Sequence, residues 1–176
     1  MATPVYYANC PDYTPEHLKH ALEGILPGQI DAFGGVSGKR IMLKPNLLAW
    51  RRADDIACVH PKLIVETARF FLDAGAKEVA LLENPAVQTA PAIIRSMGID
   101  EELKKLGVHV ANFSDYKRLP LPPEVKFHNI ELAAEFLEYD AVADIAKAKT
   151  HAMMILTLCV KNLFGLVKGC DRMGWH

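Results

Sequence analysis

The sequence predicts an α/β fold in which a mostly parallel central sheet is covered by helices. Short apolar runs rich in strand-forming residues recur along the chain, and helical patterns separate them. Strands that alternate with helices at this spacing are typical of parallel sheets. The chain has 176 residues, of which 51% are hydrophobic, and this is enough for a single domain with a core over residues 1–176.

The first elements are marked by start and stop residues. Residues 5–8 form a short strand candidate that is rich in β-formers. Thr14 followed by Pro15 predicts a helix that begins with an N-cap threonine and an N1 proline. This helix should run to about residue 25 and stop before Pro27.

The middle of the chain repeats the strand–helix alternation. A strand over residues 40–43 ends before Pro45, because proline stops a central strand. The other expected elements are, in chain order, a helix over 61–73, a strand over 78–82, helices over 90–97 and 101–106, a strand over 108–113, an edge strand over 125–130 and a helical turn over 132–137.

The last stretch, residues 140–176, has the most informative residue pattern of the chain. An apolar run over 141–146, in which Asp144 is the one charged residue, predicts a buried strand. Lys147, Lys149 and His151 then alternate with small residues, so an extended chain would place all three on one side.

A helical pattern follows over residues 152–167 and is apolar around most of its circumference. Such a helix is normally buried. We therefore expect Lys161 and Asn162 to lie inside the protein or on the wall of a cleft.

The overall charge, the cysteine spacing and the apolar content argue against several classes of protein. The net charge of −1 provides no global field for nucleic acid or an anionic membrane. The four cysteines are scattered without a CxxC pair, which argues against a zinc ribbon or a self-contained iron–sulfur motif. Neither a targeting segment nor an apolar run of about 20 residues is visible, so we expect a soluble protein of the reducing cytoplasm.

Polar residues gather at the predicted ends of strands. Ligands of open parallel sheets bind beyond the carboxyl ends of the strands. That rule brings together a candidate set made of Lys44 and Asn46, Glu83, Lys149 and His151, with Lys161 and Asn162 from the following helix. Lysines beside a helix N-terminus suit a phosphate or carboxylate. A neutral histidine can instead serve as a base or a metal ligand, and for a metal the candidates are His60, His151 and His176.

Several of these blocks resemble the DUF362 proteins, a prokaryotic family of uncharacterised function. The resemblance runs in order through Lys-Pro-Asn-Leu at 44–47, Val-His-Pro at 59–61, Gly-Ala-Lys-Glu-Val at 75–79, Ala-Lys-Thr-His at 148–151 and Thr-Leu-Cys-Val-Lys-Asn-Leu-Phe-Gly at 157–165. Longer members are described as iron–sulfur-centre proteins, but their ferredoxin-like cysteine module is absent from this sequence. The resemblance implies an incomplete or shortened version of a larger family domain. Its sheet would be completed by a second subunit, with Leu163, Phe164 and Trp175 as contact candidates, and a ferredoxin-like protein is a further candidate partner.

Two functions are consistent with these residues. The first is an enzyme or redox accessory that acts on a small anionic metabolite, which Lys44, Lys149 and Lys161 would hold while His151 exchanges a proton and Glu83 orients it. The alternative is a non-catalytic module that binds a ligand, metal or partner in the same cleft.

Overall fold

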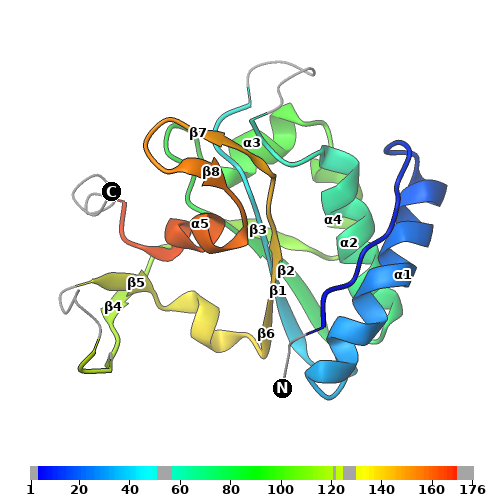
Figure 1. The fold of residues 1–176 in the computed structure, drawn as a ribbon, viewed down its shortest axis with the longest axis horizontal. Coiled ribbons are helices and arrows are strands. Elements are labelled where there is room, and N and C mark those ends of the chain that lie inside the picture. The colour runs from blue at the N-terminus through cyan, green and yellow to red at the C-terminus, as the bar shows by residue number, and fades with distance from the viewer. Residues whose placement is uncertain (1–3, 51–56, 121, 125–129, 170–176) are drawn as a thin grey trace.

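The computed structural model describes residues 4–50, 57–120, 122–124 and 130–169 (Figure 1). Its centre is a four-stranded parallel sheet in the order β3–β2–β1–β6, formed by His109–Ala111, Glu78–Leu82, Arg40–Pro45 and Ala141–Ile145. This confirms the predicted α/β class and the three strands at 40–43, 78–82 and 141–146. Among the described residues, no helix is both long enough and apolar enough to cross a membrane.

Helices cover one face of the sheet and form the main core. They are α1 (Pro15–Ala32), α2 (Pro61–Asp73), α3 (Ala90–Ser96) and α4 (Asp100–Lys105). Leu43 and Leu81 of the central strands pack there with Ile64 of α2, Ile93 of α3 and Leu103 of α4. All of these side chains are inaccessible to solvent, as the nearly continuous apolar sequence of a two-sided parallel strand requires.

The other face carries a thinner cover. Met42, Leu82, Phe113 and Ala133 form a small second core. The segments around it are short: β4 (Tyr116–Arg118) paired with β5 (Glu131–Ala133), the 3₁₀ turns η1 (Glu135–Glu138) and η2 (Phe164–Leu166), and α5 (Cys159–Leu163). In Figure 1 these segments lie on the side of the sheet opposite to α1 and α2.

Helix α1 is longer than the sequence predicts. It begins after Thr14 with Pro15 at its start, as expected, but it continues through Pro27 to Ala32. Proline in a helix interior costs a backbone hydrogen bond. Packing compensates here, because Ile30 in the last turn lies against the main core.

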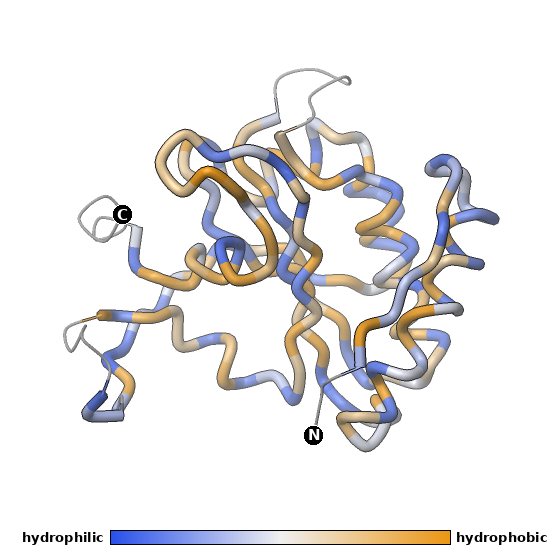
Figure 2. Tube along the Cα trace, in the orientation of Figure 1, coloured by the Kyte–Doolittle hydropathy of each residue, from blue (hydrophilic) through white to orange (hydrophobic). Residues whose placement is uncertain are grey.

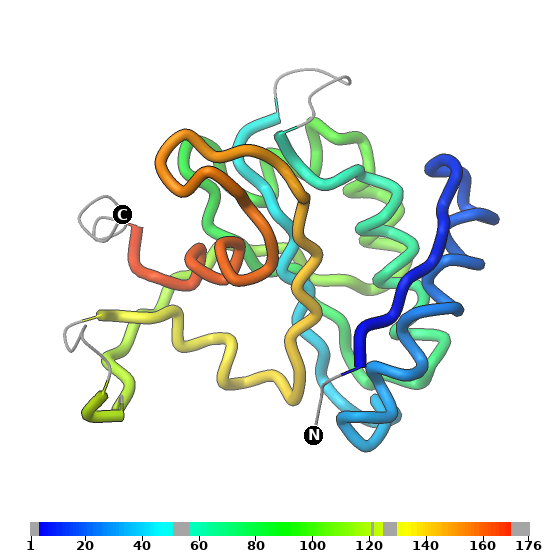
Figure 3. Tube along the Cα trace, in the orientation of Figure 1, coloured from blue at the N-terminus to red at the C-terminus, as the bar shows by residue number. Residues whose placement is uncertain are grey.

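The strand expected at residues 5–8 is not formed. This segment, which precedes α1 in the chain, runs alongside that helix, and no described strand lies beside it to pair with (Figure 3). The ring of Tyr6 instead lies against Gly28, where a Cβ atom would approach it to 2.3 Å. The expected edge strand at 125–130 falls almost entirely outside the described residues. Residues 132 and 133, expected to begin a helical turn, belong instead to strand β5 (Glu131–Ala133), and the turn begins at Glu135.

The helix expected over residues 152–167 is wrong in its first half. The chain forms a hairpin of β7 (Lys149–His151) and β8 (Ile155–Thr157), in which Lys149 pairs with Thr157. The His151 ring accepts hydrogen bonds from the backbone N–H groups of Met153 and Met154, and these bonds close the turn. Ile155 has a φ of 65°, which a right-handed helix excludes. Helical structure begins only at Cys159.

A pair of substitutions distinguishes the hairpin from a helix. We expect Ile155→Gly to be at least as stable as Ile155→Ala, by up to about 1 kcal/mol, because a positive φ penalises a Cβ atom. Both variants remove the same exposed side chain, so its contacts cancel in the comparison. At Val160, inside α5, the order should reverse, with alanine favoured by roughly 0.5–1 kcal/mol. Chemical denaturation measures both differences, and a preference for alanine at both positions would contradict the hairpin.

Candidate functional site

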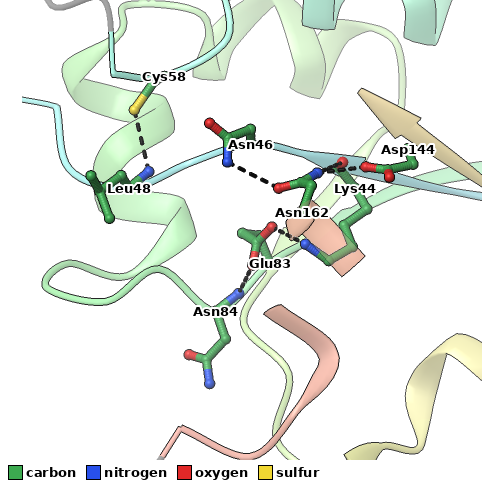
Figure 4. A network of polar contacts seen from close by, with 8 residues as sticks. All are labelled: Lys44, Asn46, Leu48, Cys58, Glu83, Asn84, Asp144 and Asn162. Carbon is green, nitrogen blue, oxygen red and sulfur yellow. Dashed lines mark hydrogen bonds and ion pairs between the residues drawn. The ribbon is translucent and has the colours of Figure 1, made fainter. Parts of the chain in front are cut away.

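A buried ion pair lies at the carboxyl edge of the sheet. Lys44 on β1 is inaccessible to solvent, and Glu83, which directly follows β2, is only 3% exposed. The Lys44 ammonium donates to Glu83 Oε2 at 2.5 Å, and Glu83 Oε1 accepts from the Asn84 N–H at 2.8 Å (Figure 4). The two residues were predicted to lie together, and the structure shows that the lysine charge is matched by the glutamate.

Gly165 closes over this ion pair. A Cβ atom at position 165 would lie 2.7 Å from Glu83 Oε1 and 2.8 Å from Lys44 Nζ. Gly165 is not among the glycines with positive φ, so space rather than backbone conformation requires glycine there. The glycine of the 157–165 block is thereby explained by the close approach of η2 to the pair.

Asn162 joins α5 to the sheet. Its side chain is buried, and its Nδ2 donates to the Lys44 carbonyl at 3.0 Å and to Asp144 Oδ1 at 2.5 Å. Its Oδ1 accepts from Asn46 Nδ2 at 3.0 Å. One carboxamide therefore links β1, the residue after β1, and β6 (Figure 4).

Asp144 was not among the predicted site residues. Burial raises its pKa, an effect that the Asn162 hydrogen bond and the charge of Lys44 oppose in part. Its Oδ2 is buried and has no hydrogen-bond partner among the described residues. The signal in the sequence was its place as the one charge in an apolar strand, because a buried carboxylate needs a reason to be there.

A second polar chain runs beside the ion pair and was also missed. Asn84 Nδ2 donates to the Tyr116 hydroxyl at 2.6 Å, and Asn112 Nδ2 donates to Asn84 Oδ1 at 3.0 Å. Asn112 Oδ1 accepts from the Ala90 N–H at the start of α3. These bonds fix the ends of β2 and β3 relative to β4 and α3. Asparagines at strand ends are common in turns, so the sequence alone did not single them out.

The other predicted basic residues lie outside the Lys44–Glu83 pair. The Lys149 ammonium donates to the Ala57 carbonyl, and the His151 ring accepts from the turn of its own hairpin. The Lys161 ammonium lies 4.9 Å from the centre of the Phe164 ring, a cation–π distance. Lys161 is half-buried in α5 rather than enclosed in a long apolar helix, whereas the predicted burial of Asn162 is confirmed.

The candidate metal ligands do not form a site within the described residues. His60 caps α2 through its Nδ1 and stacks on Tyr13 at 3.8 Å between ring centres. Burial, with Lys62 and Lys147 nearby, lowers the pKa of His60 and favours the neutral ring that this cap uses. His176 lies outside the described residues. In the described part of the chain, no group of three histidine, cysteine or acidic side chains is placed to hold a metal ion.

An iron–sulfur cluster does not fit the described cysteines. Such clusters are held by several thiolates at one point. Cys58 is instead bonded to the backbone around Leu48 and Ala49, and burial together with Asp144 raises the pKa of Cys159, favouring its thiol form.

The ion pair can be tested by a double-mutant cycle. We expect Lys44→Met and Glu83→Gln each to lower the free energy of unfolding by about 3–5 kcal/mol, because each leaves a buried charge without its partner. The double variant should lose clearly less free energy of unfolding than the two single variants lose together. The exposed pair Lys104 and Glu101 serves as the control, with negligible coupling expected. Additive losses in urea denaturation would contradict the structural role of the pair.

Asp144→Asn tests the buried carboxyl group. Because the folded-state pKa is raised, the contribution of Asp144 to stability is full below its unfolded pKa of about 3.9 and is lost as the pH rises through the folded value. An asparagine would keep the acceptor for Asn162 and remove this loss. We expect unfolding free energies at pH 7 at least equal to wild type and a weaker pH dependence above pH 4. Glu124→Gln, at an exposed position, is the control. An Asp144→Asn variant that is less stable than wild type at pH 7 would contradict this.

Comparisons with known proteins identify the family of this chain. The model of DUF362, a domain of unknown function, matches residues 41–176, which include the whole polar network. The chain is 30% identical over 139 residues to the thylakoid-associated protein sll1697 of Synechocystis sp., covering 79% of this chain and 42% of that protein. The chain thus spans less than half the length of this curated relative. No solved structure gives a significant match. The match to the family model over most of the chain shows that this protein belongs to the DUF362 family.

Proposed function

We propose that the chain binds a small anionic metabolite at the carboxyl edge of its sheet. The observation that carries this proposal is the buried polar network of Lys44, Glu83, Asn162 and Asp144. Replacing a buried ion pair with apolar residues is often neutral or stabilising, so stability alone is a weak reason for such a network. Its place at the strand ends is where parallel sheets hold ligands.

The proposal divides the residues into two roles. Lys44 and Glu83 neutralise each other inside the protein and act as a rigid support. Lys149, His151 and Lys161 are half-buried on β7 and α5, and they supply the direct contacts to the anion. A charge-assisted hydrogen bond from a lysine gains energy where the group is partly withdrawn from water.

Orphaned oxygen atoms add a requirement for the ligand. Asn46 Oδ1, Asp144 Oδ2 and Thr157 Oγ1 are buried and have no hydrogen-bond partner within the described residues. Buried polar atoms in folded proteins are nearly always paired. A metabolite that carries hydroxyl groups beside its anionic group would supply donors to such atoms, whereas a bare anion would not.

The reaction class follows from the proton-bearing groups. His151 accepts backbone hydrogen bonds at Nδ1, which leaves the proton of a neutral ring on Nε2. Asp144, whose pKa burial raises, provides a second proton-exchanging group within the network. We therefore favour proton transfer on a hydroxy acid or phosphate ester over a purely structural role. A reducing compartment such as the cytoplasm would keep the described cysteines, Cys10, Cys58 and Cys159, in the thiol form.

Ligand binding can be measured by titration calorimetry with matched probes. Malate should bind more tightly than succinate, because it adds one hydroxyl group to the same pair of carboxylates, and glycerol phosphate more tightly than inorganic phosphate for the same reason. Lys161→Met should weaken binding by about 10- to 100-fold, the equivalent of one charge-assisted hydrogen bond of about 1.5–3 kcal/mol. Lys105→Met, which removes an exposed charge from α4, is the control.

Two results would contradict the proposed function. The first is the absence of heat with all four probes at millimolar concentration. The second is equal affinity in wild type, Lys161→Met and Lys105→Met, which would place the anion away from α5.

A further inference from the structure

The hairpin of β7 and β8, together with the start of α5, exposes a run of large apolar side chains. Six of them are 47–86% exposed: Met153, Met154, Ile155, Leu156, Leu158 and Val160. Figure 2 shows this part of the chain as largely hydrophobic, and in Figure 1 the turn of the hairpin lies at the outer edge of the molecule, away from α1. Contiguous apolar surface of this kind marks a place that something else covers.

The hairpin exposes apolar side chains on both of its faces. Successive side chains of an extended chain point to opposite faces. Residues 153–156 follow one another without a break, and each of them is at least 49% exposed. A flat partner surface would cover one face of the hairpin and leave the other in water. Immersion in an apolar medium covers both faces at once.

The backbone holds the most exposed residue of the hairpin outward. Ile155 is 84% exposed and has a φ of 65°, a conformation that is rare for a β-branched residue. The turn before it is closed by the His151 ring, which accepts from the N–H groups of Met153 and Met154. Backbone strain of this kind is concentrated at functional positions. The turn is therefore built to present these side chains to the outside.

The charges of the same stretch are all positive. Residues 145–169 contain no aspartate or glutamate, whereas the chain as a whole has a net charge of −1, and their lysines are Lys147, Lys149, Lys161 and Lys168. Glu131 pairs with Lys168 at 2.6 Å and offsets one of these charges. The ammonium groups of Lys149 and Lys161 contact a backbone carbonyl and an aromatic ring, and neither of these neutralises a charge.

We propose that residues 153–160 insert into the surface of an anionic lipid bilayer. Apolar side chains beside lysines are the combination that holds a protein at a membrane surface without crossing it. The apolar side chains would enter the boundary between headgroups and acyl chains, while the lysines stay with the lipid phosphates. The attraction is local, because salt screens charges beyond about 8 Å and the overall charge adds none.

Co-sedimentation with vesicles tests the insertion. Wild type should bind vesicles of equal parts phosphatidylcholine and phosphatidylglycerol, and should bind pure phosphatidylcholine more weakly. Ile155→Glu and Val160→Glu should each weaken binding to the mixed vesicles by at least about 10-fold, because each removes an apolar side chain and brings a carboxylate to an anionic surface. Phe33→Glu is the matched control, since Phe33 is 67% exposed at the far end of α1.

The charge contribution is tested separately. Lys161→Gln should weaken binding to the mixed vesicles by about 5-fold, the effect of one lysine near an anionic surface, and should change binding to pure phosphatidylcholine little. Raising the salt concentration should reduce the difference between the two kinds of vesicle. Lys105→Gln, at an exposed position of α4, is the control and should bind like wild type.

Tryptophan fluorescence distinguishes insertion from adsorption by charge alone. With Trp50 and Trp175 replaced by phenylalanine, Met154→Trp should shift its emission to shorter wavelength when mixed vesicles are added, because the indole ring leaves water. Phe33→Trp in the same background should show no shift. Circular dichroism verifies that every variant is folded.

Four results would overturn the proposal. The first is wild type that stays in the supernatant with both kinds of vesicle. The second is binding that survives both glutamate substitutions, which places the lipid contact on another surface. The third is an emission of Met154→Trp that does not change on binding. The fourth is binding that soluble glycerol phosphate abolishes and Ile155→Glu leaves intact, which assigns the lipid headgroup to the small-anion site instead.

Discussion

The buried pair of Lys44 and Glu83 is the constraint on which the rest of the carboxyl edge depends. Two opposite charges removed from water must remain within hydrogen-bonding distance, because an isolated buried charge is very costly. This requirement fixes the ends of β1 and β2 relative to each other. It also determines what can lie above them, since only a residue without a side chain fits where Gly165 approaches.

Asn162 extends this constraint to the second face of the sheet. The apolar core on that face has four buried residues, far fewer than the core beneath α2, α3 and α4. Hydrophobic burial alone therefore supplies little to hold α5 in place. The hydrogen bonds of Asn162 to the Lys44 carbonyl and to Asp144 provide a directional attachment instead. Polar bonds thus do on this face what apolar packing does on the other.

Residue periodicity predicted strands and helices correctly where tertiary packing agreed with the local preference of the chain for strand or helix. The strands at 40–43, 78–82 and 141–146 and the helix at 61–73 formed as expected, because each carries its own pattern and a clear stop signal. It failed at residues 152–157, where an apolar run is compatible with either a helix or a strand. Three local features decided for the hairpin, and their combined effect was not visible in the pattern: the His151 cap, the positive φ of Ile155 and the pairing of Lys149 with Thr157.

The sequence by itself determined the α/β fold class, the mostly parallel direction of the strands, the place of Lys44, Asn46 and Glu83 at strand ends and the burial of Asn162. Those follow from local patterns and from the rule that parallel strands end on the same side. Only the tertiary structure decided that Lys44 is neutralised by Glu83, that Asp144 joins the network and that Lys149 and His151 are bonded elsewhere. The reason is physical: which charges meet depends on distances of a few ångströms between segments about 40 to 120 residues apart, and a linear pattern carries no such distances.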